Sequence, residues 1–296
     1  MYPSEFEYFA PRTIDEALEL LGRYGDDAKV LAGGQSLVPM MKLRMASPRY
    51  LIDINRIDGL ADLRRDGDRL VVGALCRHAD ILASTLVRDV LPIMTDAAGH
   101  TADVQVRNRG TVAGSIAHAD PAGDWPAVLA ALDTDIIVAG PSGSRTTPLA
   151  NFIIDAYTTQ LEPGEIVIGL SVGIPPKPNG GAYLKFEKRA GDFAVASVGV
   201  QIALEGEICR HISISLGALG PTAIRAASAE QELEGRDVSE DRLAEAARLV
   251  REAAQPFADT RGSVEYKQHL AGVLFRRAFD AAKDRARGRE VTTLPV

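Results

Sequence analysis

The pattern of apolar and polar positions in the N-terminal part of the chain predicts a helix, a strand, a loop and a second helix, in that order. Thr13 and Glu16 have the spacing of a capping box, and apolar residues follow at helical intervals. Lys29 to Ala32 is a short apolar run typical of a buried strand. Gly33 to Ser36 predicts a loop, and Leu37 to Met45 predicts a helix.

Further apolar runs predict a mixed architecture in the middle of the chain. Strands are expected at residues 50–54, 69–75, 135–139 and 165–174. A mostly helical segment is expected at 80–99, with a break at Leu91-Pro92, and another helix is expected to begin near Asp124.

A cluster of helix and strand breakers divides the chain. Pro175 to Gly181 contains three prolines and two glycines in seven residues, which predicts a boundary between a domain of residues 1–177 and one of 178–296. Beyond it, three strands are expected at 183–188, 194–204 and 208–216, followed by helices at 226–233, 240–254 and 263–287. The predicted fold class is α+β, with a three-stranded antiparallel sheet and helices in the second domain.

Composition and charge narrow the function. The 296 residues are 46% apolar and 25% charged, as in a globular chain. A net charge of −7 argues against binding to nucleic acid or anionic membranes. The longest stretch without Asp, Glu, Lys or Arg is 14 residues, from His211 to Ile224, and a membrane helix needs about 20. The first residues lack the basic and apolar regions of a secretory signal, so we expect a cytoplasmic protein without a transmembrane segment.

Two cysteines, Cys76 and Cys209, lie 133 residues apart. Two cysteines at this separation are too few to form an iron–sulfur cluster or a Cys-based zinc site on this chain alone. Any redox chemistry therefore needs an organic cofactor or metals on another chain. The sequence also contains no G-x-G and no Gly-Lys, so it carries neither a Rossmann fingerprint nor a P-loop.

One serine matches a catalytic motif by spacing alone. Gly169, Ser171 and Gly173 fit the G-x-S-x-G of a nucleophile elbow, which requires a helix after the serine. Here Ile174-Pro175-Pro176 follows and the segment resembles one continuous strand, so we expect no catalytic role for Ser171.

Two glycine-containing loops are candidate ligand sites. The loop Ala32 to Ser36 can turn successive N–H groups towards a phosphate at the start of a helix, although an ordinary strand-to-helix turn is the alternative. A second loop, Arg109 to Ser115, again places small residues before an apolar segment. Asp124 follows at a helix start, where it is either an N-cap or an acceptor for sugar or polyol hydroxyls. Together these features suggest an extended ligand with a phosphate and hydroxyls.

A third stretch, Lys185 to Ala194, combines a cation, an acid and an aromatic ring. These groups could stabilise an anionic reduced ring, bind its edge and lie on its face. The alternative is a solvated hairpin with two exposed basic residues.

The three stretches together resemble the FAD-binding medium subunit of molybdenum hydroxylases, the family of carbon monoxide dehydrogenase, nicotine dehydrogenase-like and xanthine dehydrogenase-type enzymes. The motifs are AGGQSL at 32–37, QVRNRGTVAGSIAHADPAGDWP at 105–126 and KFEKRAGDFA at 185–194. Their order and spacing cover nearly the whole chain. The resemblance implies a two-lobed FAD-binding domain of the PCMH type, followed by the smaller C-terminal domain.

The resemblance also implies which residues lie near FAD. They are Lys29, Ala32, Gly33, Gly34, Gln35, Ser36, Leu37, Thr111, Gly114, Ser115, Asp124, Ile168, Lys185, Asp192 and Phe193. The first loop would bind the pyrophosphate through backbone amides, Asp124 the ribityl hydroxyls, and the stretch 185–193 the flavin ring. No residue of this chain is assigned as catalytic or as a metal ligand.

The chain departs from the family pattern at three positions. Ala113 replaces the first glycine of the second loop, Ser115 replaces an asparagine, and Gln35 stands where many relatives carry His. These departures concern details of the flavin contacts.

The resemblance implies a function in electron transfer. FAD on this chain would pass electrons from 2Fe-2S clusters on a small subunit to an external acceptor, a quinone, NAD or oxygen, while a molybdopterin cofactor on a large subunit oxidises the substrate. Such a complex would be carbon monoxide dehydrogenase-like or act on aromatic or N-heterocyclic compounds. The alternatives are a self-contained FAD-dependent oxidoreductase and a non-catalytic assembly module.

Overall fold

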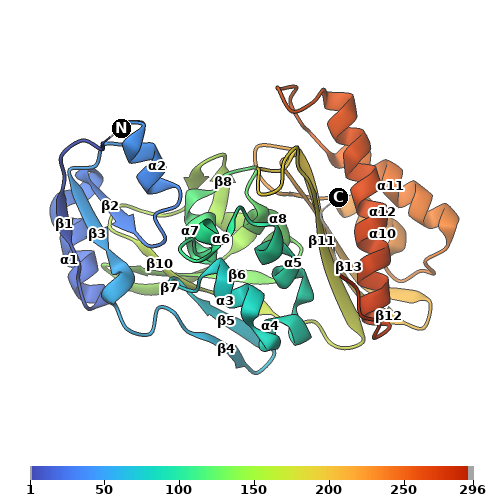
Figure 1. Ribbon diagram of the computed structural model, residues 1–296. Coiled ribbons are helices and arrows are strands. Elements are labelled where there is room, and N and C mark those ends of the chain that lie inside the picture. Colours follow the sequence, from blue (N-terminus) through green and yellow to red (C-terminus); the bar gives the residue numbers. More distant parts are fainter. Residues whose placement is uncertain (1, 293–296) are drawn as a thin grey trace.

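The computed structural model describes residues 2–292, which form three parts in a row (Figure 1). Two lobes with one continuous core make up the N-terminal part, and a four-stranded sheet covered by helices makes up the C-terminal part. This arrangement confirms the predicted α+β class and the two lobes.

The first lobe contains a three-stranded parallel sheet in the order β1-β3-β2. Its strands are β1 (Glu7–Phe9), β2 (Ala28–Leu31) and β3 (Tyr50–Asp53). The helices are α1 (Ile14–Tyr24) and α2 (Leu37–Lys42), with short 3-10 turns at Gly25–Asp27 and Ile54–Arg56.

The start of α1 and the end of α2 each have a local cause. The hydroxyl of Thr13 accepts a hydrogen bond from the N–H of Glu16 at 3.2 Å, so the predicted start of α1 is confirmed. Helix α2 ends at Lys42, three residues before the predicted Met45, because Arg44 takes a left-handed backbone conformation with φ +59°.

The second lobe contains a five-stranded antiparallel sheet in the order β4-β5-β10-β6-β7. Its strands are β4 (Leu63–Asp66), β5 (Arg69–Gly73), β6 (Thr134–Gly140), β7 (Gly143–Pro148) and β10 (Ile166–Gly173). A small hairpin of β8 (Ile153–Asp155) and β9 (Thr158–Thr159) follows α9 (Leu149–Phe152).

Helices pack beside this sheet. They are α3 (His78–Ala83), α4 (Thr85–Val90), α5 (Pro92–His100), α6 (Val104–Arg107), α7 (Val112–His118) and α8 (Asp124–Ala130). The predicted helical segment 80–99 is broken at Leu91, as expected, and also at Ser84, which was missed. The hydroxyl of Ser84 caps α4 by accepting from the N–H of Val87 at 3.2 Å.

The C-terminal part contains an antiparallel sheet in the order β11-β12-β13-β14. The strands are β11 (Asn179–Phe186), β12 (Ala196–Glu205), β13 (Ile208–Gly217) and β14 (Ile224–Arg225). The three long strands confirm the predicted meander, and the two residues of β14 extend it at one edge. Helices α10 (Ala227–Leu233), α11 (Glu240–Ala253) and α12 (Val264–Ala286) follow, and α12 packs on β11 and β12 (Figure 1).

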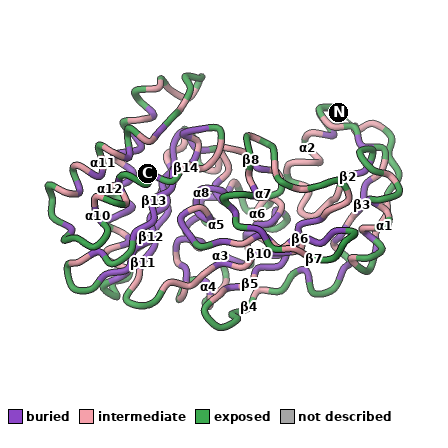
Figure 2. The backbone as a smooth tube through the Cα atoms, turned by 180° about the vertical axis from the view of Figure 1, so that it is seen from behind, coloured by how far each residue is buried: buried purple, intermediate pink, exposed green. Residues whose placement is uncertain are grey.

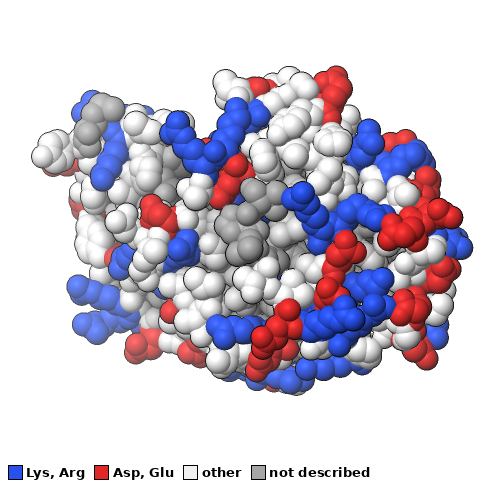
Figure 3. Space-filling view, turned by 45° about the vertical axis from the view of Figure 1, so that its right-hand side comes forward, with Lys and Arg blue, Asp and Glu red and all other residues white. Residues whose placement is uncertain are grey.

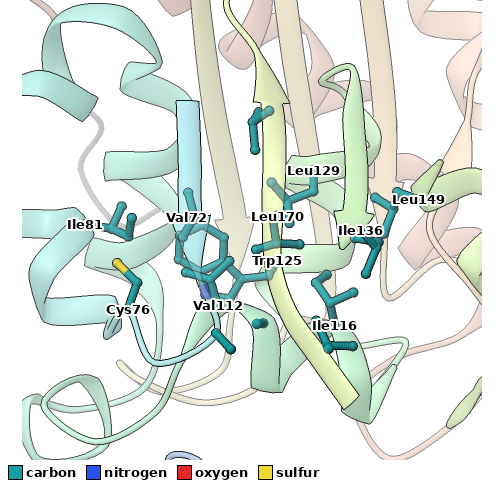
Figure 4. Close-up of a cluster of buried hydrophobic side chains, with 14 of the residues drawn as sticks. Val72, Cys76, Ile81, Val112, Ile116, Trp125, Leu129, Ile136, Leu149 and Leu170 are labelled. Atoms are coloured by element: carbon teal, nitrogen blue, oxygen red, sulfur yellow. The ribbon is translucent and has the colours of Figure 1, made fainter. Parts of the chain in front are cut away.

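The buried side chains form two clusters. One joins both lobes, with Trp125 fully buried among residues such as Val72, Val112 and Leu170 (Figure 4). The other lies between the C-terminal sheet and its helices, and Figure 2 shows its strands as buried and the outer loops as exposed. Tyr183 on β11 is fully buried yet belongs to the first cluster. The proposed domain boundary at residue 177 falls in the segment between β10 and β11, and it stays a prediction.

A buried ion pair joins the two parts of the chain. Arg285 on α12 donates to the carboxylate of Asp96 on α5 at 2.6 and 2.9 Å, and it also donates to the carbonyl of Gly181 at 2.7 Å. The same carboxylate accepts from the backbone N–H of Tyr183 at 3.1 Å. Helix α5 is therefore bonded to both β11 and α12.

On the face shown in Figure 3, acidic and basic side chains are interspersed. Within residues 2–292, no helix combines the length and the apolar character that a membrane span requires.

Candidate functional site

The two predicted glycine loops lie in direct contact. A Cβ atom at Gly33 would collide with the carbonyl oxygen of Arg109 and would lie 2.7 Å from the Cα of Gly110. Only glycine allows this approach, because any side chain at position 33 would push the loops apart. The first lobe and the second lobe therefore meet at the two loops.

The first loop presents free backbone donors. Among the hydrogen bonds of residues 2–292, none uses the N–H of Gly33, Gly34, Gln35 or Ser36. Gly34 has φ +74°, the left-handed conformation that lets consecutive N–H groups face one ligand. Unbonded N–H groups at the start of a helix favour an anion.

A cavity of about 320 Å³ lies at this loop. Its lining residues are Leu31, Ala32, Gly33, Gly34, Gln35, Val38, Pro39, Lys42 and Arg109. Its two charged lining residues, Lys42 and Arg109, are both cationic. The cavity combines amide donors with positive charge, which is suitable for a phosphate or diphosphate.

The second loop begins helix α7. The hydroxyl of Thr111 accepts from the N–H of Gly114 at 3.0 Å and caps the helix. A Cβ at Gly114 would lie 2.7 Å from that hydroxyl, so the glycine keeps the cap intact. Ala113 is buried, and Ser115 is half-buried one residue beyond Gly114.

Asp124 is the first residue of α8 and does not cap it. Gly123 occupies the N-cap position, so the alternative of a capping role for Asp124 is wrong. The carboxylate instead points towards β11. It accepts from the hydroxyl of Tyr183 at 2.7 Å and lies 3.1 Å from the Nζ of Lys185. A buried carboxylate needs such partners, because burial without them is costly.

Lys185 is the centre of this buried polar cluster. Its side chain is 1% exposed, and its Nζ donates to the carbonyls of His100 at 2.7 Å and Asp192 at 3.1 Å. The carboxylate of Glu187 lies 3.0 Å away. The ammonium group is therefore enclosed by protein atoms, and its bond to the carbonyl of Asp192 anchors the loop that carries Phe193.

Burial determines the charge states around Lys185. Burial raises the pKa of Asp124, and the positive charge of Lys185 opposes that rise. Burial also raises the pKa of Tyr183 well above its ordinary value, which keeps the phenol protonated as a donor to Asp124. The pKa of His100 is lowered by burial and then by the charge of Lys185, so this imidazole stays neutral.

The remaining predicted site residues lie on several different elements. Ile168 lies at a bulge in β10, where its carbonyl accepts from the N–H of Ala74 at 3.1 Å. Phe193 is 51% exposed, and the carboxylate of Asp192 lies 3.8 Å from Arg261. Ser36 and Leu37 begin α2, whereas Lys29 is exposed on β2 outside the residues that line the cavity. The basic residues Lys188 and Arg189 are exposed, as the alternative interpretation of that stretch expected.

Several functional candidates were missed by the sequence reasoning. Lys42 and Arg109 line the cavity. The side chain of Asn55 donates to the carbonyl of Ala32 in the first loop, and that of Arg77 donates to the carbonyl of Arg109 in the second loop. Lys42 is the last residue of α2 and follows the first loop by less than two helical turns, a spacing that could have indicated a cation near this loop. Asn55 and Arg77 give no local signal, because their partners lie elsewhere in the sequence.

Three residues with possible chemistry lie outside the site. Cys76 and Cys209 are fully buried core residues, and burial raises the pKa of each thiol to about 12. Ser171 lies within β10 and its hydroxyl accepts from Arg69 at 2.6 Å, which confirms that it is no nucleophile elbow. Over the described residues, His, Cys, Asp and Glu form no cluster that could hold a metal ion.

The chain matches two families along its length. Residues 4–177 match the family described as the FAD binding domain in molybdopterin dehydrogenase. Residues 181–282 match the family described as the CO dehydrogenase flavoprotein C-terminal domain. The resemblance found in the sequence is thereby confirmed.

Relatives of known function are similar over nearly their full length. The carbon monoxide dehydrogenase medium chain of Hydrogenophaga pseudoflava is 41% identical over 282 residues, which cover 95% of this chain and 98% of that one. The 6-hydroxypseudooxynicotine dehydrogenase complex subunit alpha of Paenarthrobacter nicotinovorans is 36% identical, with 97% of each chain covered.

A solved structure has the same fold. A chain of the carbon monoxide dehydrogenase of Hydrogenophaga pseudoflava, in a form that lacks the Mo-pyranopterin moiety of the molybdenum cofactor, matches with a TM-score of 0.94. The match covers 96% of this chain and 99% of that chain at 42% identity.

Proposed function

Because the chain belongs to the family of FAD-binding medium subunits of molybdenum hydroxylases, we propose that it transfers electrons between iron–sulfur clusters on a partner subunit and an external acceptor. Bound FAD supplies the ability to take up and release one or two electrons. The chain itself binds and orients the cofactor.

The observation that carries this proposal is the set of four unbonded N–H groups at residues 33–36, beside the cavity that Lys42 and Arg109 line. A diphosphate would accept from these N–H groups, and the two cations would balance its charge. We therefore assign the pyrophosphate end of FAD to this cavity.

The other end of the cofactor is assigned to the stretch that Lys185 anchors. Lys185 binds the carbonyl of Asp192, and the neighbouring Phe193 presents an exposed ring. Asp192 and Phe193 would flank the flavin ring. Because the Nζ of Lys185 is enclosed by protein, Lys185 acts on the ring by holding this loop in place.

Partner subunits follow from the chemistry of the chain. Its two cysteines are buried and far apart, so iron–sulfur clusters must be bound by another chain. The carbon monoxide and 6-hydroxypseudooxynicotine enzymes act on chemically different substrates, yet their subunits are 41% and 36% identical to this chain. This supports substrate oxidation on a separate molybdenum subunit, with carbon monoxide or an aromatic N-heterocycle as the candidate substrate, in the cytoplasm.

Cofactor identity is tested on the purified full chain. Its flavin, released by heat and separated by chromatography, is expected to be FAD. Release of FMN would contradict the proposal. The absence of bound flavin, both after incubation of the chain with FAD alone and after incubation with FAD and the co-purifying subunits, would also contradict it and would favour an assembly module.

The electron-transfer role is tested by comparing the chain with its complex. The isolated chain loaded with FAD should be reduced by dithionite and should oxidise neither carbon monoxide nor an organic substrate. Activity should require an iron–sulfur and a molybdenum subunit. Steady turnover by this polypeptide alone, shown by metal analysis to contain no molybdenum or iron, would establish the self-contained oxidoreductase instead.

A further inference from the structure

Asn55 and Arg77 connect the two glycine loops through side chains, and we call this pair the loop clasp. The Nδ2 of Asn55 donates to the carbonyl of Ala32 in the first loop at 2.8 Å. The Oδ1 of Asn55 accepts from one Nη of Arg77, and the other Nη donates to the carbonyl of Arg109 in the second loop at 2.6 Å. Three hydrogen bonds thus run from one loop to the other.

The orientation of Asn55 is fixed from the opposite side. One carboxylate oxygen of Asp53 accepts from both the N–H and the Nδ2 of Asn55, at 2.9 and 2.5 Å. The other accepts from the hydroxyl of Tyr8 at 2.5 Å. Burial raises the pKa of Asp53, but these hydrogen bonds outweigh it and lower the pKa below its ordinary value. The ionised carboxylate holds the amide nitrogen on the side of Ala32.

Backbone pairing brings Arg77 to the second loop. Arg77 and Thr111 form an antiparallel bridge, and the N–H of the next residue, His78, donates to the carbonyl of Gly110 at 3.1 Å. The guanidinium is half-buried at the point where Gly33 touches Arg109. A planar group with several donors can bind two acceptors at once in this position, which an ammonium group cannot do with the same geometry.

Peptide geometry links the clasp to the cavity. In a planar trans peptide the C=O of one residue and the N–H of the next point in opposite directions. Because Asn55 binds the C=O of Ala32, the N–H of Gly33 must point away from Asn55. This N–H is the first of the four unbonded donors beside the cavity. Losing the clasp would let this peptide rotate and the two loops separate.

We propose that Asn55 and Arg77 are positioning residues for the diphosphate of FAD. They set the direction of the Gly33 N–H and the distance between the two loops, without touching the cofactor. This inference rests on the assignment of the pyrophosphate to the cavity at residues 31–42 and 109.

The test measures FAD and ADP affinity of the full chain by fluorescence quenching and by calorimetry, in Asn55→Leu and Arg77→Met variants. Each variant should bind FAD about 10- to 100-fold more weakly, the range for losing a hydrogen bond to a charged group. ADP, which has the diphosphate and no flavin ring, should weaken by the same factor. The double variant should bind about as weakly as the poorer single variant, because either change breaks the same connection.

Arg77→Lys separates geometry from charge. This variant keeps the positive charge but cannot bind Asn55 and Arg109 together, so it should remain weakened. Recovery of full affinity in Arg77→Lys would show that only charge matters and would overturn the clasp. Arg65→Met, which alters an exposed arginine of β4 that binds the carbonyl of Gly67, is the matched control and should leave both affinities unchanged.

Folding is followed separately by thermal denaturation of the ligand-free variants. If Asn55→Leu does not fold, the smaller Asn55→Ala serves in its place, since it also removes the amide group that binds Ala32 and Arg77. Unchanged FAD and ADP affinities in folded variants would contradict the clasp alone. A wild-type chain that binds neither ligand would contradict the proposed function itself.

Discussion

Neighbouring glycines in the first loop are required for different reasons. Gly33 has no room for a Cβ, because the backbone of Arg109 and Gly110 lies against it. A Cβ at Gly34 would approach only side chains, that of Leu31 at 3.0 Å and that of Val38 at 3.2 Å, but the φ of Gly34 is +74°. The first glycine therefore permits a contact between loops, and the second permits a backbone conformation.

This difference predicts unequal effects of two alanine substitutions. Gly33→Ala must displace the second loop and should reduce FAD affinity by 100-fold or more, about 3 kcal/mol. Gly34→Ala strains one residue by about 1 to 2 kcal/mol, which is roughly 5- to 30-fold if the strain opposes binding. Titration of both variants with FAD measures the order of these effects.

Two other glycines provide matched controls. Gly59 has φ +81° with open space around it, and Gly22 has open space and no positive φ. Gly59→Ala and Gly22→Ala should leave FAD affinity unchanged. Equal affinities of the Gly33→Ala variant and the wild type would show that the contact between the loops is irrelevant to binding.

His78 couples the stability of the protein to pH. It is buried, its ring stacks on Trp125 with centroids 5.6 Å apart, and burial lowers its pKa to about 4, helped by the charges of Arg77 and Arg107. Between pH 6.5 and about 4 the unfolded chain binds a proton at this position and the folded chain does not. The free energy of unfolding should therefore fall as the pH drops through this window, by about 3 kcal/mol in full.

Urea unfolding at pH 7 and pH 4.5 measures this effect. His78→Gln should lose much of the difference between the two pH values, leaving the share of His100, whose pKa burial also lowers. His269→Gln changes an exposed histidine on α12 and should keep the wild-type difference. A His78→Gln variant with the full wild-type difference would show that His78 does not cause it.

Among the secondary-structure elements, α5 forms the connection between the N-terminal and C-terminal parts. The side chains of Asp96 and Arg285 are 5% and 12% exposed, so the ion pair between α5 and α12 is largely removed from water. Breaking such a pair takes a counter-charge away from a buried charged group.

Arg285→Met should therefore lower the free energy of unfolding by about 3 to 5 kcal/mol. Asp96→Asn together with Arg285→Met should recover part of this loss, because the buried carboxylate is then absent as well. Arg289→Met removes a surface pair with Asp284 and should cost less than about 1 kcal/mol. Urea unfolding of the four proteins provides the comparison, and equal losses in Arg285→Met and Arg289→Met would contradict this role of the pair.

Elements with a continuous apolar pattern were predictable from the sequence. In β12, nine of the ten residues are buried, and the corresponding apolar run identified the strand. Strands β4 and β7 were missed because their residues are mostly polar and exposed at the edges of the sheet. Their place in the sheet is determined by pairing with β5 and β6.

The site was predictable to the extent that it depends on local backbone. The glycines of both loops and the acid at position 124 were identified from motifs and spacing. The burial of Lys185 was not, because a Lys-Phe-Glu-Lys pattern equally suits a solvated strand. Asn55 and Arg77 act only after β3, α3 and both loops have come together, so no neighbouring residue indicates their role.

For the molecule as a whole, the proposed cofactor site draws on all three parts of the fold. The first and second lobes provide the two loops, and the C-terminal part provides Lys185, Asp192 and Phe193. The ion pair between Asp124 of the second lobe and Lys185 of the C-terminal part connects these two parts. FAD bound in this way would contact every part of the chain.

Tyr183 adds a consequence for how the whole chain melts. Its ring completes the core of the N-terminal lobes although its strand belongs to the C-terminal sheet, and its hydroxyl binds Asp124. Loss of structure in the C-terminal part would remove Tyr183 from the core of the lobes, and loss of the lobes would expose this buried side chain, so both parts should melt as one cooperative unit. Differential scanning calorimetry of the ligand-free chain should record a single peak whose calorimetric enthalpy equals the van't Hoff enthalpy. Two separate peaks would mean that the shared tyrosine does not couple the halves, and the single peak should divide in a Tyr183→Ala variant.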